Sequence, residues 1–334
     1  MNTPKLIFSS DSQLTGQDQR NLVKLCNRGV LQRIRNGSYV KSEDWNALSP
    51  REKYGLSAQA YRHKAEDEPV FCFATAALLW GLWIVGTPSL VHVRTTVTAG
   101  GCNRNGIKRH IAPANDRVVH CGHLLITDKL TTTMDLINKL TFPYAVAICD
   151  SSLRPLDPHH QINHFSDTFD DQTEAHWVAD YPQGTPLNTE SLRAAAMQLP
   201  SQSARTRTLA VINFASALSG SAGESISRAK MHLFGFPAPE LQKKFTLRDG
   251  SDAFTDFWFK ELKLVGEFDG KGKYLRADWG GGASIQDRVL AEKKREDDIR
   301  NQGARFVRWT WAEMMNRERF IMLLRHAGLV PKRK

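Results

Sequence analysis

Three acidic residues in the C-terminal third of the chain have the spacing of a metal-ion site. Asp256 lies in a run of aromatic residues, where a lone carboxylate is costly to bury. Glu267 and Asp269 are two residues apart in the next strand-like run, so their side chains share a face. A hairpin around Lys260 and Glu261 would bring Asp256 beside Glu267. Because neighbouring carboxylates repel each other, the pattern predicts a bound divalent cation, Mg²⁺ or Mn²⁺, which could polarise a phosphodiester and activate water.

The alternative interpretation is that one or more of these acids lies at a solvated strand end. The elements around them favour a packed sheet. Helical patterns, three strand-like runs, a further helix, a strand and a closing helix follow one another. This order predicts a mixed sheet flanked by helices. The expected ranges are 206–218 and 223–229 for the first helices, 241–247, 253–259 and 262–268 for the strands, then 286–301, 305–309 and a helix to about 329.

The N-terminal 64 residues predict a helix followed by a basic hairpin. An apolar stripe that includes Leu22 and Leu25 has helical spacing, and Gly29 suits a left-handed C-cap. Asn36-Gly37 is a strong hairpin turn. We therefore expect a winged helix-turn-helix that binds DNA, although a helix and hairpin that only pack is the alternative. The basic residues expected to contact DNA here are Arg20, Lys24, Arg28, Arg33 and Arg35.

The central part of the chain predicts packing rather than chemistry. Residues 65–154 contain an apolar helix at 71–83 and no converging catalytic groups, which indicates a small α/β scaffold domain. Residues 155–204 predict an acidic linker rich in proline. Its histidines could suggest a metal site, but a solvated acidic loop is the favoured interpretation; they are His159, His160, His164 and His176. The last domain is expected at 205–334.

Charge and cysteine content favour a cytoplasmic, polyanion-binding protein. Of the formal charge of +10, residues 1–64 carry a surplus of six and residues 193–334 a surplus of ten, whereas 155–192 hold seven acids and no Lys or Arg. Basic modules at both ends suggest nucleic acid as a partner. Five scattered cysteines argue against a disulfide framework or zinc ribbon. No segment predicts a membrane span or signal peptide, and a homodimer is left open.

Two resemblances sharpen these expectations. The run from Arg28 to Val40 resembles the N-terminal winged helix of AbiEi-family antitoxins, and the following segment, with Ala76-Ala77-Leu78-Leu79-Trp80-Gly81-Leu82 and Val91-His92-Val93, is similar to actinobacterial relatives of that family. In that family the second module is a scaffold, which agrees with the residue pattern.

The second resemblance covers roughly residues 220–325. Gly223-Glu224-Ser225, Thr255-Asp256-Phe257, Gly266-Glu267-Phe268-Asp269-Gly270 and Lys273-Tyr274 occur in the order of the domain related to very-short-patch-repair endonucleases, a PD-(D/E)xK fold that actinobacterial proteins often fuse to an AbiEi-like N-terminus. Glu292-Lys293-Lys294-Arg295-Glu296-Asp297 and Val307-Arg308-Trp309 complete the pattern. The resemblance implies Asp256 and Glu267 as metal ligands, Glu224 as a further ligand or base, and Asp269 as an additional carboxylate.

One departure from that pattern matters. The parent motif has a lysine two residues after the glutamate, where this chain has Asp269. A cationic group must then come from elsewhere, with Lys273 the first candidate, then Lys271 or Lys293. Lys293, Lys294 and Arg295 could instead contact phosphates beside the site or form a solvated helix face. The expected function is thus a Mg²⁺-dependent DNA endonuclease in defence or repair, and the alternative is a transcriptional regulator or antitoxin whose nuclease-like domain is silent.

Overall fold

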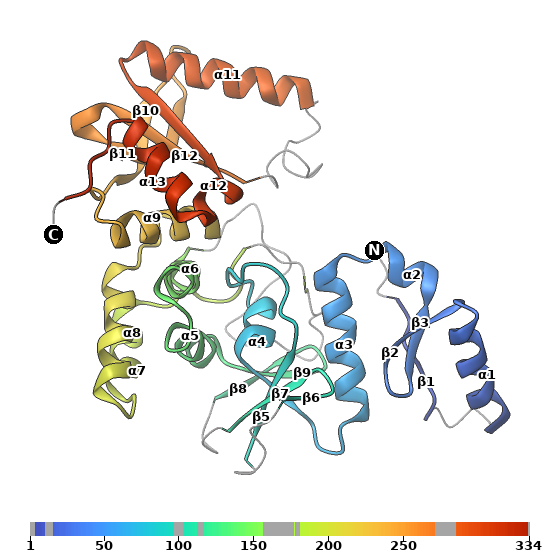
Figure 1. Ribbon diagram of the computed structural model, residues 1–334. Coiled ribbons are helices and arrows are strands. Elements are labelled where there is room, and N and C mark those ends of the chain that lie inside the picture. Colours follow the sequence, from blue (N-terminus) through green and yellow to red (C-terminus); the bar gives the residue numbers. More distant parts are fainter. Residues whose placement is uncertain are drawn as a thin grey trace. The chain divides into compact units, whose positions relative to one another are not determined.

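The computed structural model describes residues 4–10, 16–96, 103–111, 117–155, 177, 181–270 and 285–332. Helices and three β-sheets make up this part of the chain, so the α/β class expected from the sequence is confirmed. None of the helices in these ranges is long and apolar enough to cross a membrane. The chain forms two compact units, Met1–Leu136 with Pro155–Asn188 and Ile137–Arg154 with Thr189–Lys334, which Figure 1 colours along the sequence.

The first unit begins with a helix and a small antiparallel sheet. Helix α1 (Gly16–Asn27) ends as expected at Gly29, whose φ is +75° and whose amide bonds the Cys26 carbonyl. Strands β2 (Leu31–Arg35) and β3 (Ser38–Lys41) form the hairpin, with β1 (Ile7–Phe8) beside β3. Helices α2 (Ser42–Ala47) and α3 (Pro50–Lys64) follow. Of the residues described before this hairpin, α1 is the one helix, so the helix-turn-helix pair stays a prediction.

A six-stranded mixed sheet completes the first unit. Its order is β6-β7-β5-β4-β9-β8. The apolar run expected as a helix over 71–83 is divided: Phe71 belongs to a strand, the backbone turns at Phe73 with a φ of +49°, and the helix Phe73–Leu79 stops before Gly81, whose φ is +63°. The elements are β4 (Val70–Phe71), α4 (Phe73–Leu79), β5 (Val91–Thr95), β6 (Asn103–Arg104), β7 (Ile107–Ile111), β8 (Val118–Cys121), β9 (Leu124–Thr127) and α5 (Lys129–Ile137).

The second unit starts with a group of helices. Helix α6 (Phe142–Leu153), expected to belong to the domain at 65–154, packs on α8 (Gln202–Phe214) and α9 (Ala222–Leu233). The physical reason is a buried ion pair: Asp150 of α6 accepts from Arg228 Nη2 of α9 at 2.8 Å and also from three serines. Helix α7 (Thr189–Met197) packs on α8. Residues 189–197 and 202–214, expected in part as linker, are therefore helical.

A four-stranded mixed sheet is the centre of the second unit. Strands β10 (Glu240–Thr246), β11 (Asp252–Phe259) and β12 (Leu264–Asp269) form an antiparallel meander, and β13 (Arg305–Thr310) adds to β12 in parallel. A short 3₁₀ turn, η3 (Lys260–Leu262), joins β11 to β12, which confirms the hairpin expected there. Helix α11 (Ile285–Asn301) is the crossover to β13, and α12 (Trp311–Met315) and α13 (Arg317–His326) close the chain. The element order expected from the sequence is confirmed.

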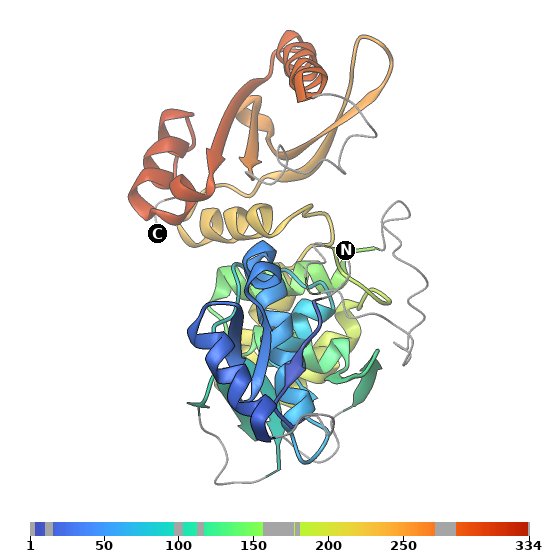
Figure 2. The same ribbon diagram turned by 90° about the vertical axis from the view of Figure 1, so that its right-hand side faces the viewer.

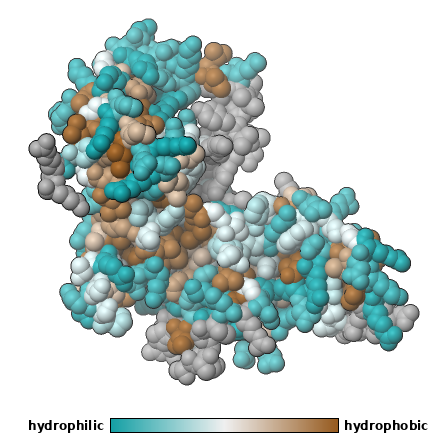
Figure 3. Space-filling view, viewed as in Figure 1, coloured by the Kyte–Doolittle hydropathy of each residue, from teal (hydrophilic) through white to brown (hydrophobic). Residues whose placement is uncertain are grey.

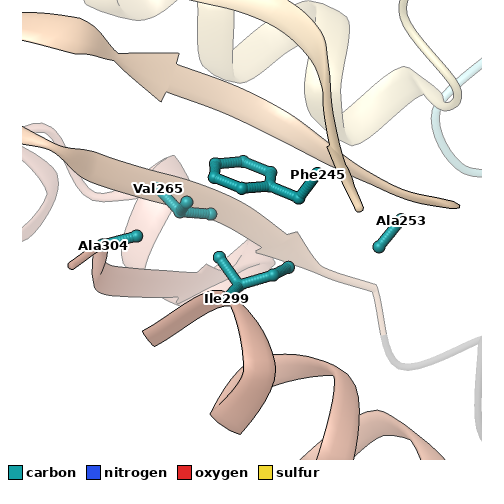
Figure 4. Close-up of a cluster of buried hydrophobic side chains, with 5 residues drawn as sticks. All are labelled: Phe245, Ala253, Val265, Ile299 and Ala304. Carbon is teal, nitrogen blue, oxygen red and sulfur yellow. The ribbon is translucent and has the colours of Figure 1, made fainter. Parts of the chain in front are cut away.

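Each face of this sheet packs against a different helix, as Figures 1 and 2 show. Helix α9 packs on the face of Phe268 and Trp309, where a Cβ added at Gly223 would overlap the Phe268 ring. The indole of Trp309 donates to Ser227 of α9 at 2.8 Å. Helix α11 covers the other face through a buried cluster in which Ile299 meets the sheet residues Phe245, Ala253 and Val265 and the adjoining Ala304 (Figure 4). Residues 264–269 therefore alternate between the two helices.

Candidate functional site

A row of polar residues crosses the sheet of the second unit, one from each strand. Glu267 is paired with Arg308, and the β11–β12 ladder ends at Phe257 and Gly266, so Asp256 and Glu267 each lie next to the last pair of this ladder. The β10–β11 register places Gln242 opposite Asp256. The flanking rows are largely apolar or aromatic. We call Gln242, Asp256, Glu267 and Arg308 the polar row. Four polar side chains at one level of a packed sheet are expensive, which marks this level as the candidate site.

Asp256 lies where β11 and β12 stop pairing. The ladder between these strands ends at Phe257 and Gly266, and beyond it Asp256 Oδ2 accepts a hydrogen bond from the backbone amide of Phe268 at 2.9 Å. A carboxylate thus takes the place of a backbone acceptor between the two strands. This fork in the sheet holds the Asp256 carboxylate next to the backbone of β12.

Glu267 is held by two arginines on the face that α11 covers. The residue is 9% exposed. Its Oε1 lies 2.8 Å from Arg295 Nη2, and its Oε2 lies 2.8 Å from Arg308 Nη2. Burial lowers the pKa of each arginine, but Glu267 and the neighbouring acids together outweigh this effect, and both pKa values are raised above the usual arginine value. Glu267 is therefore charge-compensated by the chain itself.

The two arginines belong to a larger network of alternating charges. Arg308 Nη2 also lies 2.8 Å from Glu292 Oε1 and 3.0 Å from Glu296 Oε2, both on α11. Arg295 Nη1 lies 3.1 Å from the same Glu292 oxygen. Arg295 further donates to the Phe254 carbonyl of β11 at 2.7 Å, so its guanidinium bridges β11 and β12 beside Asp256. Asp269 is close enough to help raise the pKa of Arg308.

Glu224 lies on α9, on the side of the sheet away from Arg295. It caps its own helix: Oε2 accepts from the Gly220 amide at 2.6 Å, and Oε1 accepts from Ser221 Oγ at 2.9 Å. Gln242 connects it to the polar row, because its Nε2 lies 3.5 Å from Glu224 Oε2. Gln242 has a left-handed φ of +51° in the middle of β10, a strained conformation of the kind found at functional sites.

The remaining residues expected at the metal site are placed only in part. Lys271 and Lys273 lie outside the described residues. Across the described ranges, no group of three or more His, Cys, Asp or Glu side chains is arranged to hold a metal ion. The histidines considered in the linker, at 159–164 and 176, also lie outside these ranges. The described geometry thus places Asp256 and Glu267 on neighbouring strands, beside the last β11–β12 pair, and brings Glu224 to Gln242.

Helix α11 divides its three consecutive basic residues. Arg295 turns inward to Glu267, whereas Lys293 and Lys294 are exposed. Lys294 Nζ has Asp249 Oδ2 at 3.9 Å, a contact that solvent screens strongly. Figure 3 shows a largely hydrophilic surface over α11, with a hydrophobic group toward its N-terminal end, where Val289 and Leu290 are exposed. Lys293 and Lys294 therefore face solvent, where a phosphate backbone can reach them.

The basic residues of the first unit also fall into two groups. Arg20 and Lys24 of α1 and Arg28 directly after it are exposed and recur every four residues, so they form one stripe, called the stripe on α1. Arg33 is exposed on the hairpin and bonds Asn36. Arg35 is turned into the unit, where it donates to the carbonyls of Ser57 and Asn105 at 2.8 Å each. Burial lowers the pKa of Arg35. Of the five basic residues predicted to contact DNA here, the stripe on α1 and Arg33 thus face solvent and Arg35 does not.

Sequence reasoning missed the part played by Gln242 and Arg308. Arg308 stands between Val307 and Trp309 in an apolar strand, which was a usable signal because a charge there needs a partner. Nothing comparable marks Gln242, whose role depends on its left-handed backbone. A scan of protein-family models gives no match to the chain, and a search of curated proteins also finds none.

Proposed function

We propose that this protein binds DNA and hydrolyses phosphodiester bonds at the polar row, with Mg²⁺ or Mn²⁺ as cofactor. The observation that supports this most is the position of Asp256 and Glu267 on neighbouring strands, next to the point where β11 and β12 separate. Two carboxylates at one fork offer the oxygen ligands that Mg²⁺ prefers. The helix–meander–helix–strand order is also that of the PD-(D/E)xK core, which supports the resemblance to very-short-patch-repair endonucleases.

The residues of this chain would have distinct tasks at such a site. Asp256 and Glu267 would hold the ion, and Glu224 would support them through Gln242. When bound, the ion would polarise the phosphodiester and lower the pKa of a coordinated water. Lys293 and Lys294 would contact phosphates beside the site, and the stripe on α1 would hold the duplex elsewhere. The free thiols Cys26, Cys72, Cys121 and Cys149 fit a reducing, cytoplasmic setting in defence or repair.

A second function is favoured by a specific observation. Both oxygens of Glu267 have arginine partners, and Asp269 stands where the resemblance expects a lysine. A carboxylate whose charge is already neutralised by two arginines gains less free energy from binding a cation. On this basis the alternative is a transcriptional regulator or antitoxin that uses the same fold only to bind DNA.

One experiment separates the two. Purified protein is incubated with supercoiled, linear, mismatched and single-stranded DNA, with Mg²⁺ or Mn²⁺, alongside Asp256→Asn, Glu267→Gln and the control Lys244→Gln. Lys244 is an exposed residue of β10 paired with Asp252 and lies outside the polar row. Cleavage by the wild type and the control that both acid variants lose supports the hydrolase. Tight, salt-sensitive binding by the wild type without cleavage on any substrate supports the regulator.

A further inference from the structure

We infer that Arg295 and a divalent cation are alternative partners of Glu267, so that the guanidinium occupies the metal position until an ion displaces it. This inference rests on the proposed metal site and adds its regulation. It starts from the place of Arg295 Nη2, which lies 2.8 Å from Glu267 Oε1 on β12 and 2.7 Å from the Phe254 carbonyl on β11. The guanidinium of Arg295 thereby bridges β11, which carries Asp256, and β12, which carries Glu267.

The bridge explains how the site is stable without an ion. Glu267 is nearly buried, and an uncompensated carboxylate there would be costly. A guanidinium and a divalent cation both neutralise this charge, and both need the same Oε1. They therefore compete. The competition predicts that ion binding is weakened by the free energy needed to break the Arg295 contact.

Arg295 rather than Arg308 is the arginine that an ion would displace from Glu267. Arg308 lies on β13 beside Glu267, and its guanidinium also contacts Glu292 and Glu296. Its positive charge is therefore neutralised without a change of position. Arg295 reaches in from a helix at the end of a long side chain. If it leaves Glu267, it keeps the adjacent Glu292, whose Oε1 lies 3.1 Å from its other terminal nitrogen. A short swing along α11 is therefore enough to expose Glu267 Oε1.

The test measures Mn²⁺ affinity directly. Metal-stripped wild type, Arg295→Met, Arg295→Lys and the control Arg300→Met are titrated with Mn²⁺ and followed by the electron paramagnetic resonance of the free ion. Arg300 is a matched control, since it lies on the same helix and pairs with Glu296 rather than Glu267. We expect roughly tenfold tighter binding in Arg295→Met, an intermediate gain in Arg295→Lys and no change in Arg300→Met. The Mg²⁺ concentration for half-maximal cleavage should fall in the same order.

The Mn²⁺ titrations distinguish failure of the competition from failure of the metal site itself. Equal or weaker Mn²⁺ binding by Arg295→Met, with the circular dichroism and melting temperature of the wild type, overturns the competition and leaves the proposed metal site standing. Saturable binding that Glu267→Gln abolishes is required of the metal site itself. If neither the wild type nor Arg295→Met binds Mn²⁺ in that manner, the metal site and the competition both fail. Tighter binding in Arg295→Met without cleavage of any DNA supports the competition and overturns the hydrolase.

Discussion

At the scale of single residues, the two central carboxylates of the polar row differ in what they bind. Asp256 accepts from a neutral backbone amide, whereas Glu267 is neutralised by two guanidiniums whose side chains are 22% and 28% exposed. An amide in place of Asp256 still accepts a hydrogen bond. An amide in place of Glu267 leaves two partly buried positive charges with less compensation.

The stability of the two amide variants should therefore differ. We expect Glu267→Gln to lower the free energy of unfolding by roughly 1–2 kcal/mol, a value reduced from that of a fully buried pair because the arginines are partly exposed. Asp256→Asn should cost no more than about 1 kcal/mol. Urea unfolding followed by tryptophan fluorescence measures both. A larger loss in Asp256→Asn than in Glu267→Gln would contradict this account of the site.

Lys129 gives the first unit a pH dependence. Its Nζ donates to the carbonyls of Gly184 and Thr185, and burial lowers its pKa to about 7. Between this value and the ordinary lysine pKa of about 10.4, the unfolded chain binds a proton that the folded chain does not. Stability from this group therefore rises as pH increases from 7 toward 10. We expect the melting temperature of the wild type, relative to that of Lys129→Met, to increase from pH 7 to pH 9.5; a flat or falling difference would refute it.

At the scale of elements, the sequence predicts a helix or strand correctly where the local residue pattern agrees with the tertiary packing. The strands of the second unit and α11 were predictable, because alternating aromatic and β-branched residues favour strands and 286–301 favours a helix. The apolar run 71–83 was harder, since its periodicity does not show that Phe71 pairs in a sheet. The placement of Asp256 and Glu267 on neighbouring strands followed from the hairpin. The partners of Glu267 did not, because Arg295 and Arg308 are 28 and 41 residues further along the chain.

At Gly223, where α9 contacts β12, helix propensity favours alanine whereas the packing against Phe268 favours glycine. Gly223 is a helical residue, and replacing glycine by alanine in a helix normally stabilises it by about 1 kcal/mol. Here the new methyl group would overlap the buried ring of Phe268 and push α9 from the sheet. We expect Gly223→Ala to lower the free energy of unfolding by about 1–3 kcal/mol, the usual cost of overpacking.

A second substitution makes this expectation specific. Phe268→Leu shortens the side chain that the new methyl group meets, so the double variant Gly223→Ala/Phe268→Leu should lose less stability than the sum of the two single variants. Urea unfolding of all four proteins gives the coupling energy. Additive losses would show that the Phe268 ring is not what excludes a Cβ at position 223.

At the scale of the whole molecule, exposed basic residues are found in both units. The stripe on α1, Arg20, Lys24 and Arg28, belongs to the first unit, and Lys293 and Lys294 belong to the second. Each phosphate that a basic side chain neutralises contributes about 0.9 to the slope of log binding constant against log salt concentration. The proposed function requires both surfaces to contact DNA, so each set should contribute its own part of this slope.

We therefore expect two independent decreases in salt dependence. Replacing Arg20, Lys24 and Arg28 by glutamine should reduce the slope for duplex DNA by about 2–3, and replacing Lys293 and Lys294 should reduce it by about 1–2. A control with the same loss of three charges, at the ion-paired Arg62, Lys244 and Arg300, should leave the slope close to that of the wild type because these side chains already have acidic partners. Fluorescence anisotropy of a labelled duplex between low and moderate salt measures all four proteins.

If the control lowers the slope as much as the α1 variant does, binding depends on net charge alone and the two surfaces have no specific role. If only one set changes the slope, DNA contacts one unit, and the proposal that both units grip the substrate is wrong.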